Sequence, residues 1–394
     1  MEFYHDILEN LLDKLIDYRG KTPKKTLSGI PLVTAKIVKN GTINGYTEFI
    51  AEEDYDKWMV RGFPKVGDVI LTTEAPLGEV ALLKEEKVAL AQRIVCLRGK
   101  DNVLNNTYLK YYLQSGKGQK SLSARESGTT VTGIKQAELR RVDIEYPTYE
   151  NQLRIASILS SLDRKIELNN KINADLEEMA QAIFKNWFVD FEPFKDGKFV
   201  DSELGMIPEG WKVGTLTEIA SYMNGLAMQK YPPENIEDSL PVLKIKELGQ
   251  GFCGTDSDRC SCNIKDECKI HNGDVIFSWS GTLLVDVWCG GDCGLNQHLF
   301  KVTSNDYPKW FYYYWTKHHL QEFIHIAKDK AVTMGHIKRG HLEEALVAIP
   351  DNDSMEKAHE LFEPILSKMI SLRLENSRLS LLRDTLLPRL MSGE

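Results

Sequence analysis

The chain of 394 residues lacks long hydrophobic runs and an export signal. No segment approaches 18 consecutive apolar residues, which argues against a membrane-spanning helix. Residues 1–6 lack the basic start and apolar run of a signal peptide, and seven cysteines, an odd number, are best interpreted as reduced thiols. We therefore expect a cytoplasmic protein with no membrane partner.

The catalytic motifs that can be recognised by spacing are also missing. Gly116–Ser121 does not have the spacing of a Walker A loop, and no expected strand is followed by G-x-G-x-x-G. Tyr231–Glu234 is not preceded by the Asn or Asp of an amino-methyltransferase motif, and the carboxylates near Lys87 form no convincing nuclease constellation. We predict that the chain does no chemistry alone and binds no cofactor.

Six of the seven cysteines lie between Cys253 and Cys293. A zinc site would use Cys253, Cys260, Cys262, Cys268 and His271. The paired C-x₂₋₄-C spacing of common structural zinc sites is absent, so we favour no metal and keep zinc as the alternative.

The formal charge of −8 argues mildly against a nucleic-acid partner. Residues 1–149 nevertheless hold 22 Lys and Arg against 20 Asp and Glu, so that most of the acidity lies elsewhere in the chain. Screening confines the relevant field to about 10 Å, and a local basic stripe is therefore enough to bind phosphates.

The longest unbroken helical pattern spans 150–188, and a second copy follows 203 positions later. Apolar residues spaced alternately three and four apart predict that the two helices pack against each other as an antiparallel coiled coil. Asn173 and Asn376 occupy equivalent places and are expected either to face each other or to point to water. We expect Pro388 to end or kink the second helix near Leu387, and Asp353–Glu356 to form its capping box. The predicted seam consists of Leu159, Leu162, Ile166, Asn173, Leu176, Ile183, Trp187, Phe362, Ile365, Met369, Asn376, Leu379 and Leu386.

The duplication extends upstream of the helices. Ile134 matches Ile337 at the same shift, while Gly67–Ile70 matches Gly273–Ile276 and Gln92 matches Gln297 at shifts of 205 to 206. Only the lead-in Trp211–Leu216 has no clear counterpart before Leu12. The predicted organisation is block 1 (1–149), a long helix (150–192), a linker (193–210), block 2 (211–350) and a second long helix (351–394).

Each block is expected to be a mixed α/β domain, so that the fold class is α+β. In block 1 the apolar runs 30–33, 69–71, 80–83 and 94–97 are bounded by turn residues and predict strands, and 106–113 predicts a helix. In block 2, Phe311–Trp315 is expected to be a half-buried helix face and not a base-stacking platform.

Several stretches resemble the specificity subunit of type I restriction-modification enzymes. They include Asp17–Pro23, Gly67–Val80, Leu162–Asn169, Ser202–Trp211 and Leu386–Gly393. The resemblance implies two target recognition domains that each read half of a bipartite double-stranded DNA site, and two helices that hold them apart and dock methyltransferase subunits. S-adenosylmethionine, ATP and Mg would then bind to partner subunits, including a restriction/translocase subunit. The rival interpretations are a protein-interaction scaffold without DNA binding and an enzyme with an unrecognised site.

Under this resemblance, donor-rich loops supply the candidate DNA contacts. We expect Lys21, Lys24, Lys25 and Lys135 chiefly on phosphates, and Thr73, Gln92 and Arg93 on base edges, with Trp279, Gln297 and His298 in the matching places. A solvated surface is the alternative for each Lys and Thr. The complete set of candidates is Arg19, Lys21, Lys24, Lys25, Thr72, Thr73, Gln92, Arg93, Thr129, Thr130, Lys135, Lys230, Ser278, Trp279, Gln297, His298, Lys330, Thr333 and Lys338.

Overall fold

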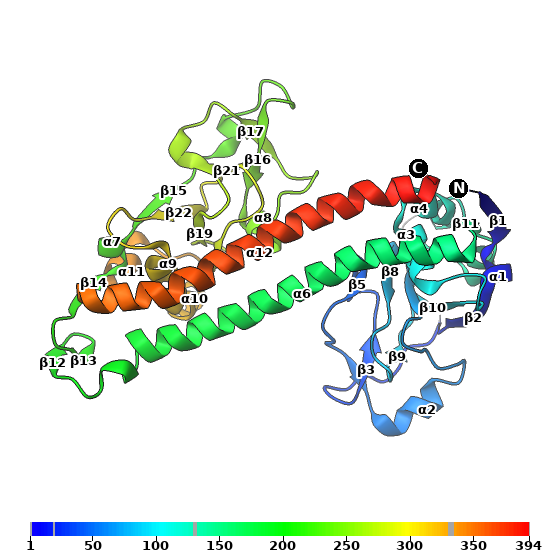
Figure 1. The fold of residues 1–394 in the computed structure, drawn as a ribbon, viewed down its shortest axis with the longest axis horizontal. Helices are drawn as coiled ribbons and strands as arrows, with labels where there is room; N and C mark the ends of the chain where they lie inside the picture. Colours follow the sequence, from blue (N-terminus) through cyan, green and yellow to red (C-terminus); the bar gives the residue numbers. More distant parts are fainter. Residues whose placement is uncertain (1, 19, 129–131, 330–334, 394) are drawn as a thin grey trace. The chain divides into compact units, whose positions relative to one another are not determined.

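The computed structural model describes residues 2–18, 20–128, 132–329 and 335–393, and it divides into two compact units. Unit 1 comprises Met1–Ile166 and Leu379–Glu394, and unit 2 comprises Glu167–Arg378. Each unit contains one α/β block and a part of both long helices (Figure 1). Among the described residues, no helix is long and apolar enough to cross a membrane.

Block 1 contains two small sheets. The larger sheet is antiparallel, in the order β2 (Leu12–Asp17), β10 (Ile94–Gly99), β7 (Val69–Thr73), β8 (Leu77–Leu82). The smaller has the order β6 (Phe49–Ile50), β3 (Ile30–Val33), β9 (Ala89–Leu90), and β3 runs parallel to β9. The strands and the helix that we predicted from apolar runs are therefore confirmed.

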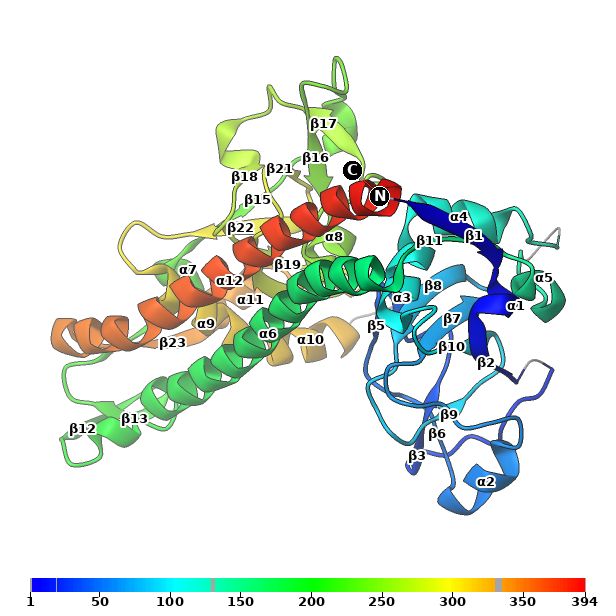
Figure 2. The same ribbon diagram turned by 45° about the vertical axis from the view of Figure 1, so that its right-hand side comes forward.

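Shorter elements complete block 1. Strand β1 lies beside β11, which directly precedes the first long helix (Figure 2). The elements are β1 (Phe3–Ile7), α1 (Leu8–Leu11), β4 (Val38–Lys39), β5 (Thr42–Ile43), η1 (Glu52–Asp54), α2 (Tyr55–Trp58), α3 (Asn106–Gln114), α4 (Gly116–Ser123), α5 (Gln136–Arg140) and β11 (Asp143–Pro147).

Block 2 repeats this plan. Its larger sheet has the order β15 (Ser221–Asn224), β22 (Leu299–Thr303), β19 (Val275–Ser278), β20 (Leu284–Val287). Its second sheet has the order β17 (Arg259–Ser261), β16 (Ser239–Leu243), β21 (Cys293–Leu295), β18 (Lys269–Ile270), and again contains a parallel pair, β16 with β21. The other elements are β14 (Lys212–Thr215), α7 (Leu216–Ile219), η3 (Met228–Lys230), α8 (Ile245–Gln250), η4 (Asp266–Cys268), α9 (Lys309–His318), α10 (Leu320–Asp329), α11 (Arg339–Glu344) and β23 (Leu346–Ile349).

One expectation about the edges of the blocks is wrong. The lead-in to block 2 does have a counterpart, because β14 pairs with β23 before α7 just as β1 pairs with β11 before α1. The passage 193–210, which we predicted to be a linker, contains regular structure. It begins in the short helix η2 (Glu192–Phe194) and folds into a hairpin of β12 (Phe199–Ser202) and β13 (Gly205–Pro208).

The long helices are α6 (Tyr149–Phe188) and α12 (Asn352–Ser392). In unit 1, Arg383 Nη1 donates to Asp163 Oδ1 at 2.9 Å. In unit 2, Asn169 Nδ2 donates to Asn376 Oδ1 at 2.8 Å, and the Phe184 and Phe362 ring centroids are 6.3 Å apart. As α6 advances, its partner positions on α12 move back along the chain, so the helices are antiparallel within each unit. Every residue of the predicted seam is buried or half-buried.

Three details of these helices differ from expectation. Helix α12 continues through Pro388 to Ser392, although Pro388 has no N–H to donate to the carbonyl of Asp384 four residues earlier. Its first turn is capped by Asp351, whose carboxylate accepts from Ser354 N at 2.8 Å, and not by a box that begins at Asp353. Asn376 bonds to Asn169 and Asn170, so the expectation that Asn173 faces Asn376 is wrong.

Helix α9 is more deeply buried than we predicted. Trp310 to Thr316 are all buried, because α9 packs between the larger sheet and the long helices. The aromatic run is therefore core and is not available for base stacking.

Candidate nucleic-acid interface

In block 1, three turns that are distant in sequence meet beside the parallel pair β3 and β9. Ala91 N donates to Val33 O at 3.0 Å, which places the Gln92–Arg93 turn beyond the end of β3. Thr73 N then donates to Arg93 O at 2.8 Å, and Ile134 N donates to Thr73 O at 2.9 Å. These bonds fix Gln92 and Arg93 next to the end of β7 and next to the segment that precedes α5.

Block 2 brings the equivalent turns together, and two of the three backbone bonds recur. Asn296 N donates to Leu243 O at 3.1 Å, and Ile337 N donates to Trp279 O at 3.1 Å. The turn after β21 thus presents Gln297 and His298 beside Trp279. The His298 and Trp279 ring centroids are 5.9 Å apart.

The side chains of the block 1 turn are polar and accessible. Gln92 is half-buried and Arg93 is exposed, with a left-handed backbone at φ 74°. The Arg93 guanidinium pairs with Glu74 at 3.0 Å, and both side chains keep substantial exposure, so this ion pair is easily exchanged for another anion. Thr72 is different because its buried hydroxyl accepts from Glu79 N at 2.9 Å, which removes it from the accessible surface.

The equivalent residues Thr73 and Trp279 share an unusual property. Both Thr73 Oγ1 and Trp279 Nε1 are buried and have no hydrogen-bond partner among the described atoms. A buried polar atom without a partner costs on the order of 1–3 kcal/mol, so each such atom needs an explanation. Ser278, next to Trp279, is buried and bonds to the carbonyl oxygens of Ser280 and Thr282, and so behaves like Thr72.

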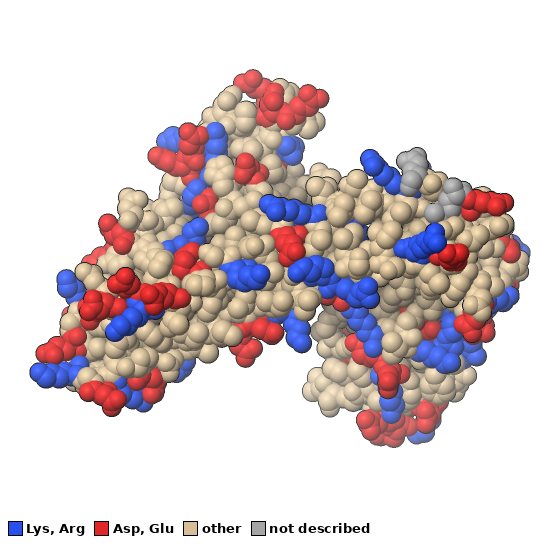
Figure 3. Space-filling model, in the orientation of Figure 1, with Lys and Arg blue, Asp and Glu red and all other residues tan. Residues whose placement is uncertain are grey.

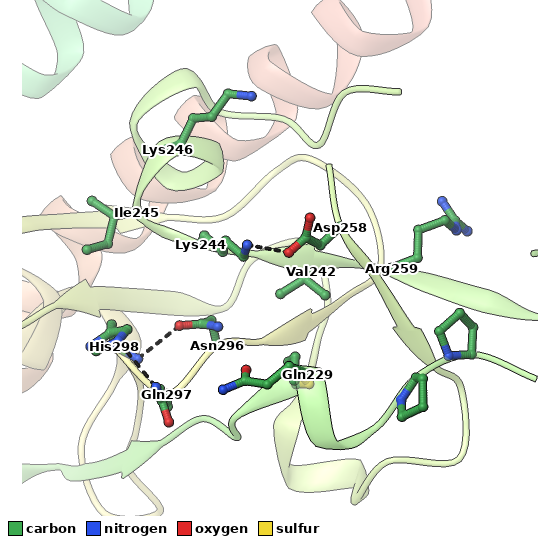
Figure 4. Close-up of a pocket in the computed structure, with 13 residues that line it drawn as sticks. Gln229, Val242, Lys244, Ile245, Lys246, Asp258, Arg259, Asn296, Gln297 and His298 are labelled. Carbon is green, nitrogen blue, oxygen red and sulfur yellow. Dashed lines mark hydrogen bonds and ion pairs between the residues drawn. The ribbon is translucent and has the colours of Figure 1, made fainter. Parts of the chain in front are cut away.

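A pocket of about 720 Å³ opens beside the block 2 turn (Figure 4). Asn296, Gln297, His298 and Gln229 lie along one side of it, opposite Lys244 and Asp258. The lining also includes Met228, Pro232, Pro233, Val242, Ile245, Lys246 and Arg259. Three cations and several amides around one opening provide donors and acceptors that suit phosphate oxygens and base edges.

The two lysines of the pocket are held by acidic neighbours, and Arg259 is held by Ser239. Lys244 pairs with Asp258, and Lys246 pairs with Asp256 at 2.5 Å. The Arg259 guanidinium donates to the Ser239 carbonyl at 2.6 Å. On the face shown in Figure 3, Lys and Arg alternate with Asp and Glu in the same manner, and the described residues form no large patch of one sign.

The remaining candidates lie outside these clusters. Lys21 and Lys24 are exposed on the segment between β2 and β3, and Lys25 on that segment pairs with Glu48 at 2.7 Å. Lys135 and Lys338 are exposed at equivalent places immediately before α5 and α11, each one residue after the Ile whose backbone N–H donates to Thr73 or Trp279. Lys230 is exposed at the end of η3, next to the pocket residues Met228 and Gln229. Arg19, Thr129, Thr130, Lys330 and Thr333 fall outside the described residues.

Our sequence reasoning missed most of the pocket. Gln229, Lys244, Arg259 and Asn296 come from four separate segments. One signal in the sequence could have found a part of this pocket. The strand Ile30–Val33 matches Leu240–Leu243. The segments that directly follow these strands, Thr34–Lys36 and Lys244–Lys246, are therefore equivalent as well. In the described parts of the chain, no group of three or more His, Cys, Asp or Glu side chains is arranged to hold a metal ion.

The fold and these repeated turns define a protein with two similar binding domains on a shared helical support. Residues 14–178 and 208–376 each match the family described as "Type I restriction modification DNA specificity domain". The chain belongs to this family.

Curated relatives and a solved structure agree with this assignment. The type I restriction enzyme MjaIX specificity subunit of Methanocaldococcus jannaschii is 31% identical, with 95% of this chain and 90% of the relative covered. The HindI specificity subunit of Haemophilus influenzae is 22% identical over 70% of this chain and 73% of its own length. The crystal structure of the type I system S subunit from M. genitalium shares the fold with a TM-score of 0.57 and 17% identity, over 99% of this chain and 96% of that one.

Proposed function

We propose that the chain is the DNA-recognition subunit of a type I restriction-modification system, and that each block reads one half of a bipartite site. One observation carries this proposal. The same turns meet in both blocks, and each presents a Gln followed by a basic or imidazole side chain beside an unpartnered buried polar atom. Gln pairs well with adenine and Arg with guanine in the major groove.

Within this proposal the chain binds no cofactor and catalyses no reaction. The methyltransferase subunits supply S-adenosylmethionine, and the restriction subunit supplies ATP and Mg. The complex works in the cytoplasm, where its DNA substrate lies. The absence of recognised nucleotide-binding and methyltransferase motifs supports this division of labour.

Selection of bound duplexes from a random library by the full chain with its methyltransferase subunits tests the proposal. We expect two short conserved half-sites separated by a spacer of fixed length, and affinity that falls steeply with salt. Gln92→Ala should relax one half-site and Gln297→Ala the other, whereas Lys24→Ala should weaken all sequences alike. A chain that assembles its partner subunits but selects no sequence would be the scaffold of the rival interpretation.

We further propose that the long helices set the spacer. Inserting one heptad into each helix tests this, provided that the insertions spare the ion pairs of Glu177 with Lys317 and of Arg383 with Asp163. One heptad after Leu168 and one after Arg378 would leave those contacts intact and lengthen each helix by about 10 Å. At 3.4 Å per base pair this predicts a spacer longer by roughly three base pairs, with weaker binding because the half-sites also rotate. Recovery of the original spacer would rule out the helices as its determinant.

A further inference from the structure

The carboxylate of Glu74 lies against the Gln92–Arg93 turn of block 1. Its Oε1 is 3.0 Å from Nε of Arg93, and both side chains are partly exposed. Glu74 directly follows β7 and forms an isolated β-bridge with Gly133. A Cβ placed on Gly133 would lie 2.9 Å from the carbonyl oxygen of Thr73, so the two segments touch backbone to backbone. The ion pair is therefore held by backbone contacts on both of its sides.

Two residues of this cluster have an unfavourable backbone conformation. Arg93 has φ 74°, and Ala75, which follows Glu74, has φ 50°. Residues other than glycine rarely adopt a positive φ, and those that do cluster at functional sites. Among the described residues, five non-glycine residues have a positive φ. Two of the five lie at this one ion pair, which singles it out from the other surface ion pairs of the chain.

The equivalent positions of block 2 are in contact as well. Ser280 is the equivalent of Glu74 at a shift of 206 positions. His298 is the equivalent of Arg93 at a shift of 205, and its Nδ1 lies 3.5 Å from Ser280 Oγ. Ser280 also forms the corresponding isolated β-bridge, here with His336. The contact between the two positions thus recurs, while its chemistry changes from carboxylate and guanidinium to hydroxyl and imidazole. This is the pattern expected of positions that set a different specificity on the same frame.

A G·C pair presents complementary groups side by side in the major groove. Guanine offers the acceptors O6 and N7, and cytosine offers the donor N4–H₂ next to O6. Arg is the commonest partner of guanine, and Glu accepts from cytosine N4. The ion pair uses Nε of Arg93, which leaves both terminal nitrogens of the guanidinium for a bidentate contact.

We propose that Glu74 and Arg93 together read one G·C pair of half-site 1, the half-site that block 1 binds. The ion pair opens, the guanidinium donates to guanine O6 and N7, and the Glu74 carboxylate accepts from cytosine N4. Each charge exchanges one partner for another, so neither is left unpaired in the complex. This inference rests on the proposed function and adds to it a base pair and a second residue that reads it.

The same two charges reject the other base pairs. At A·T, Arg93 would face the adenine N6–H₂ donor and Glu74 would face the thymine O4 acceptor. In the reversed C·G orientation, the guanidinium would meet a donor and the carboxylate would meet acceptors. Unfavourable contacts at both residues make this pair more selective than a lone Arg.

Base replacement in selected duplexes tests which residue reads which base. The full chain with its methyltransferase subunits is titrated with duplexes that carry each base pair in turn at every position of half-site 1. We expect one position at which wild type prefers G·C by at least about tenfold. There, 7-deazaguanine, which lacks the N7 acceptor, should weaken binding by wild type but not by Arg93→Ala. A cytosine analogue without the 4-amino group should weaken binding by wild type but not by Glu74→Ala.

Conservative variants separate lost reading from lost folding. Glu74→Gln keeps an oxygen that accepts from cytosine N4 and should retain part of the preference. Arg93→Lys keeps the charge without the planar fork, and should keep most of the affinity but lose most of the preference. Discrimination at half-site 2 should stay unchanged in every variant. Glu9→Gln is the matched control, because Glu9 forms a partly exposed ion pair with Arg140 at 3.2 Å in the same block and should change no base preference.

The outcomes distinguish this inference from the proposed function. A half-site 1 without a preferred G·C pair, or an equal effect of 7-deazaguanine on wild type and Arg93→Ala, would overturn the inference and leave the proposed function standing. If Glu74→Ala responds to the cytosine analogue as wild type does, Glu74 does not read cytosine and the paired readout is wrong. A wild-type complex that selects no sequence would instead refute the proposed function.

Discussion

The two blocks have the same fold but join the long helices by different chemistry. In unit 1, the joint centres on Asp163 of α6, which pairs with Lys110 at 2.8 Å and Arg383 at 2.9 Å and accepts a hydrogen bond from Tyr111 at 2.5 Å. In unit 2, the equivalents of Asp163, Lys110 and Arg383 at the 203-residue shift are Leu366, Tyr313 and Ala180. All three are buried in one aromatic core.

A further pair of positions follows the same rule. Gln152 in unit 1 is fully buried and holds three backbone groups, those of Val103, Asn105 and Pro147. Its equivalent in unit 2 is Met355, which packs against the aromatic core. In that core Trp310 stacks on Phe362 with ring centroids 4.7 Å apart, and the rings of Phe184 and Phe188 also contact Phe362.

This difference shows that the two copies kept the same backbone arrangement after the duplication, whereas the residues that attach each block to the long helices diverged. The hydrogen bonds of a polar network fix how the groups that they join are oriented. They contribute little net stability once the cost of removing these groups from water is subtracted. An aromatic core stabilises through buried area and tolerates small changes of angle. We therefore expect unit 1 to be the more sensitive to charge and pH, and unit 2 to be the more sensitive to lost volume.

The largest effect should come from Phe362→Ala, which removes a fully buried ring that contacts four other aromatic residues. We expect unit 2 to lose about 4 kcal/mol of unfolding free energy, within the range for buried Phe to Ala. Denaturant unfolding followed by Trp fluorescence measures the loss. Leu361→Ala, an exposed neighbour on the same helix, is the control and should change stability by less than about 0.5 kcal/mol.

The next effect sharpens the contrast at the unit 1 joint. Asp163→Leu takes the carboxylate from two largely buried cations and should cost about 3 kcal/mol. Adding Lys110→Tyr and Arg383→Ala copies the unit 2 residues and should recover most of that loss, since no buried charge then lacks its partner. The free energies of unfolding of the single and triple variants, measured at equilibrium, test whether this recovery occurs. A triple variant less stable than the single one would show that the unit 1 backbone cannot accept the apolar joint.

We expect pH to change the stability of the unit 1 joint by less than Asp163→Leu does. Burial raises the pKa of Asp163, but Lys110, Tyr111 and Arg383 outweigh it and hold this pKa below the usual 3.8. Because the folded pKa is the lower one, ionised Asp163 contributes stability above the unfolded pKa, and the contribution disappears as the pH falls through the folded value. The stability difference between wild type and the triple variant should therefore change between about pH 5 and pH 2 in the direction that disfavours wild type. A stability difference that stays constant over this pH range would show that protonation of Asp163 does not affect folding stability.

The parts of the structure that follow from local pattern could be predicted from the sequence. Strands such as Ile30–Val33, the two long helices and the shared block plan all leave repeated apolar spacing in the chain. The candidate pocket does not, because Lys244 and Arg259 meet only through the pairing of β16 with β17, and Gln229 joins them from the separate short helix η3. No spacing rule relates those segments before the sheet is known.

The error over Asn173 has a geometric cause. In an antiparallel pair, equivalent residues face each other only at the midpoint, which lies near Lys171 and Leu374 because Asn169 bonds to Asn376. Asn173 is beyond that point and meets a different turn of α12. A seam shows which residues face the partner helix, but only contacts along the pair fix which partner residue each one meets.

The smallest expected effect distinguishes two asparagines of α6 that lie one helical turn apart. Both asparagines are buried with an Oδ1 that has no partner among the described atoms, but only Asn169 donates to α12, to Glu375 and Asn376, each at 2.8 Å. Asn169→Leu reproduces Leu372, the residue of the second copy, but removes both hydrogen bonds, and we expect a loss of about 1 kcal/mol. Asn173→Leu removes an unsatisfied group instead and should raise stability by about 0.5 kcal/mol. Thermal unfolding of the two variants measures the difference. If both shift the midpoint in the same direction, apolar volume in the seam, and not hydrogen bonding, decides the stability of the helix pair.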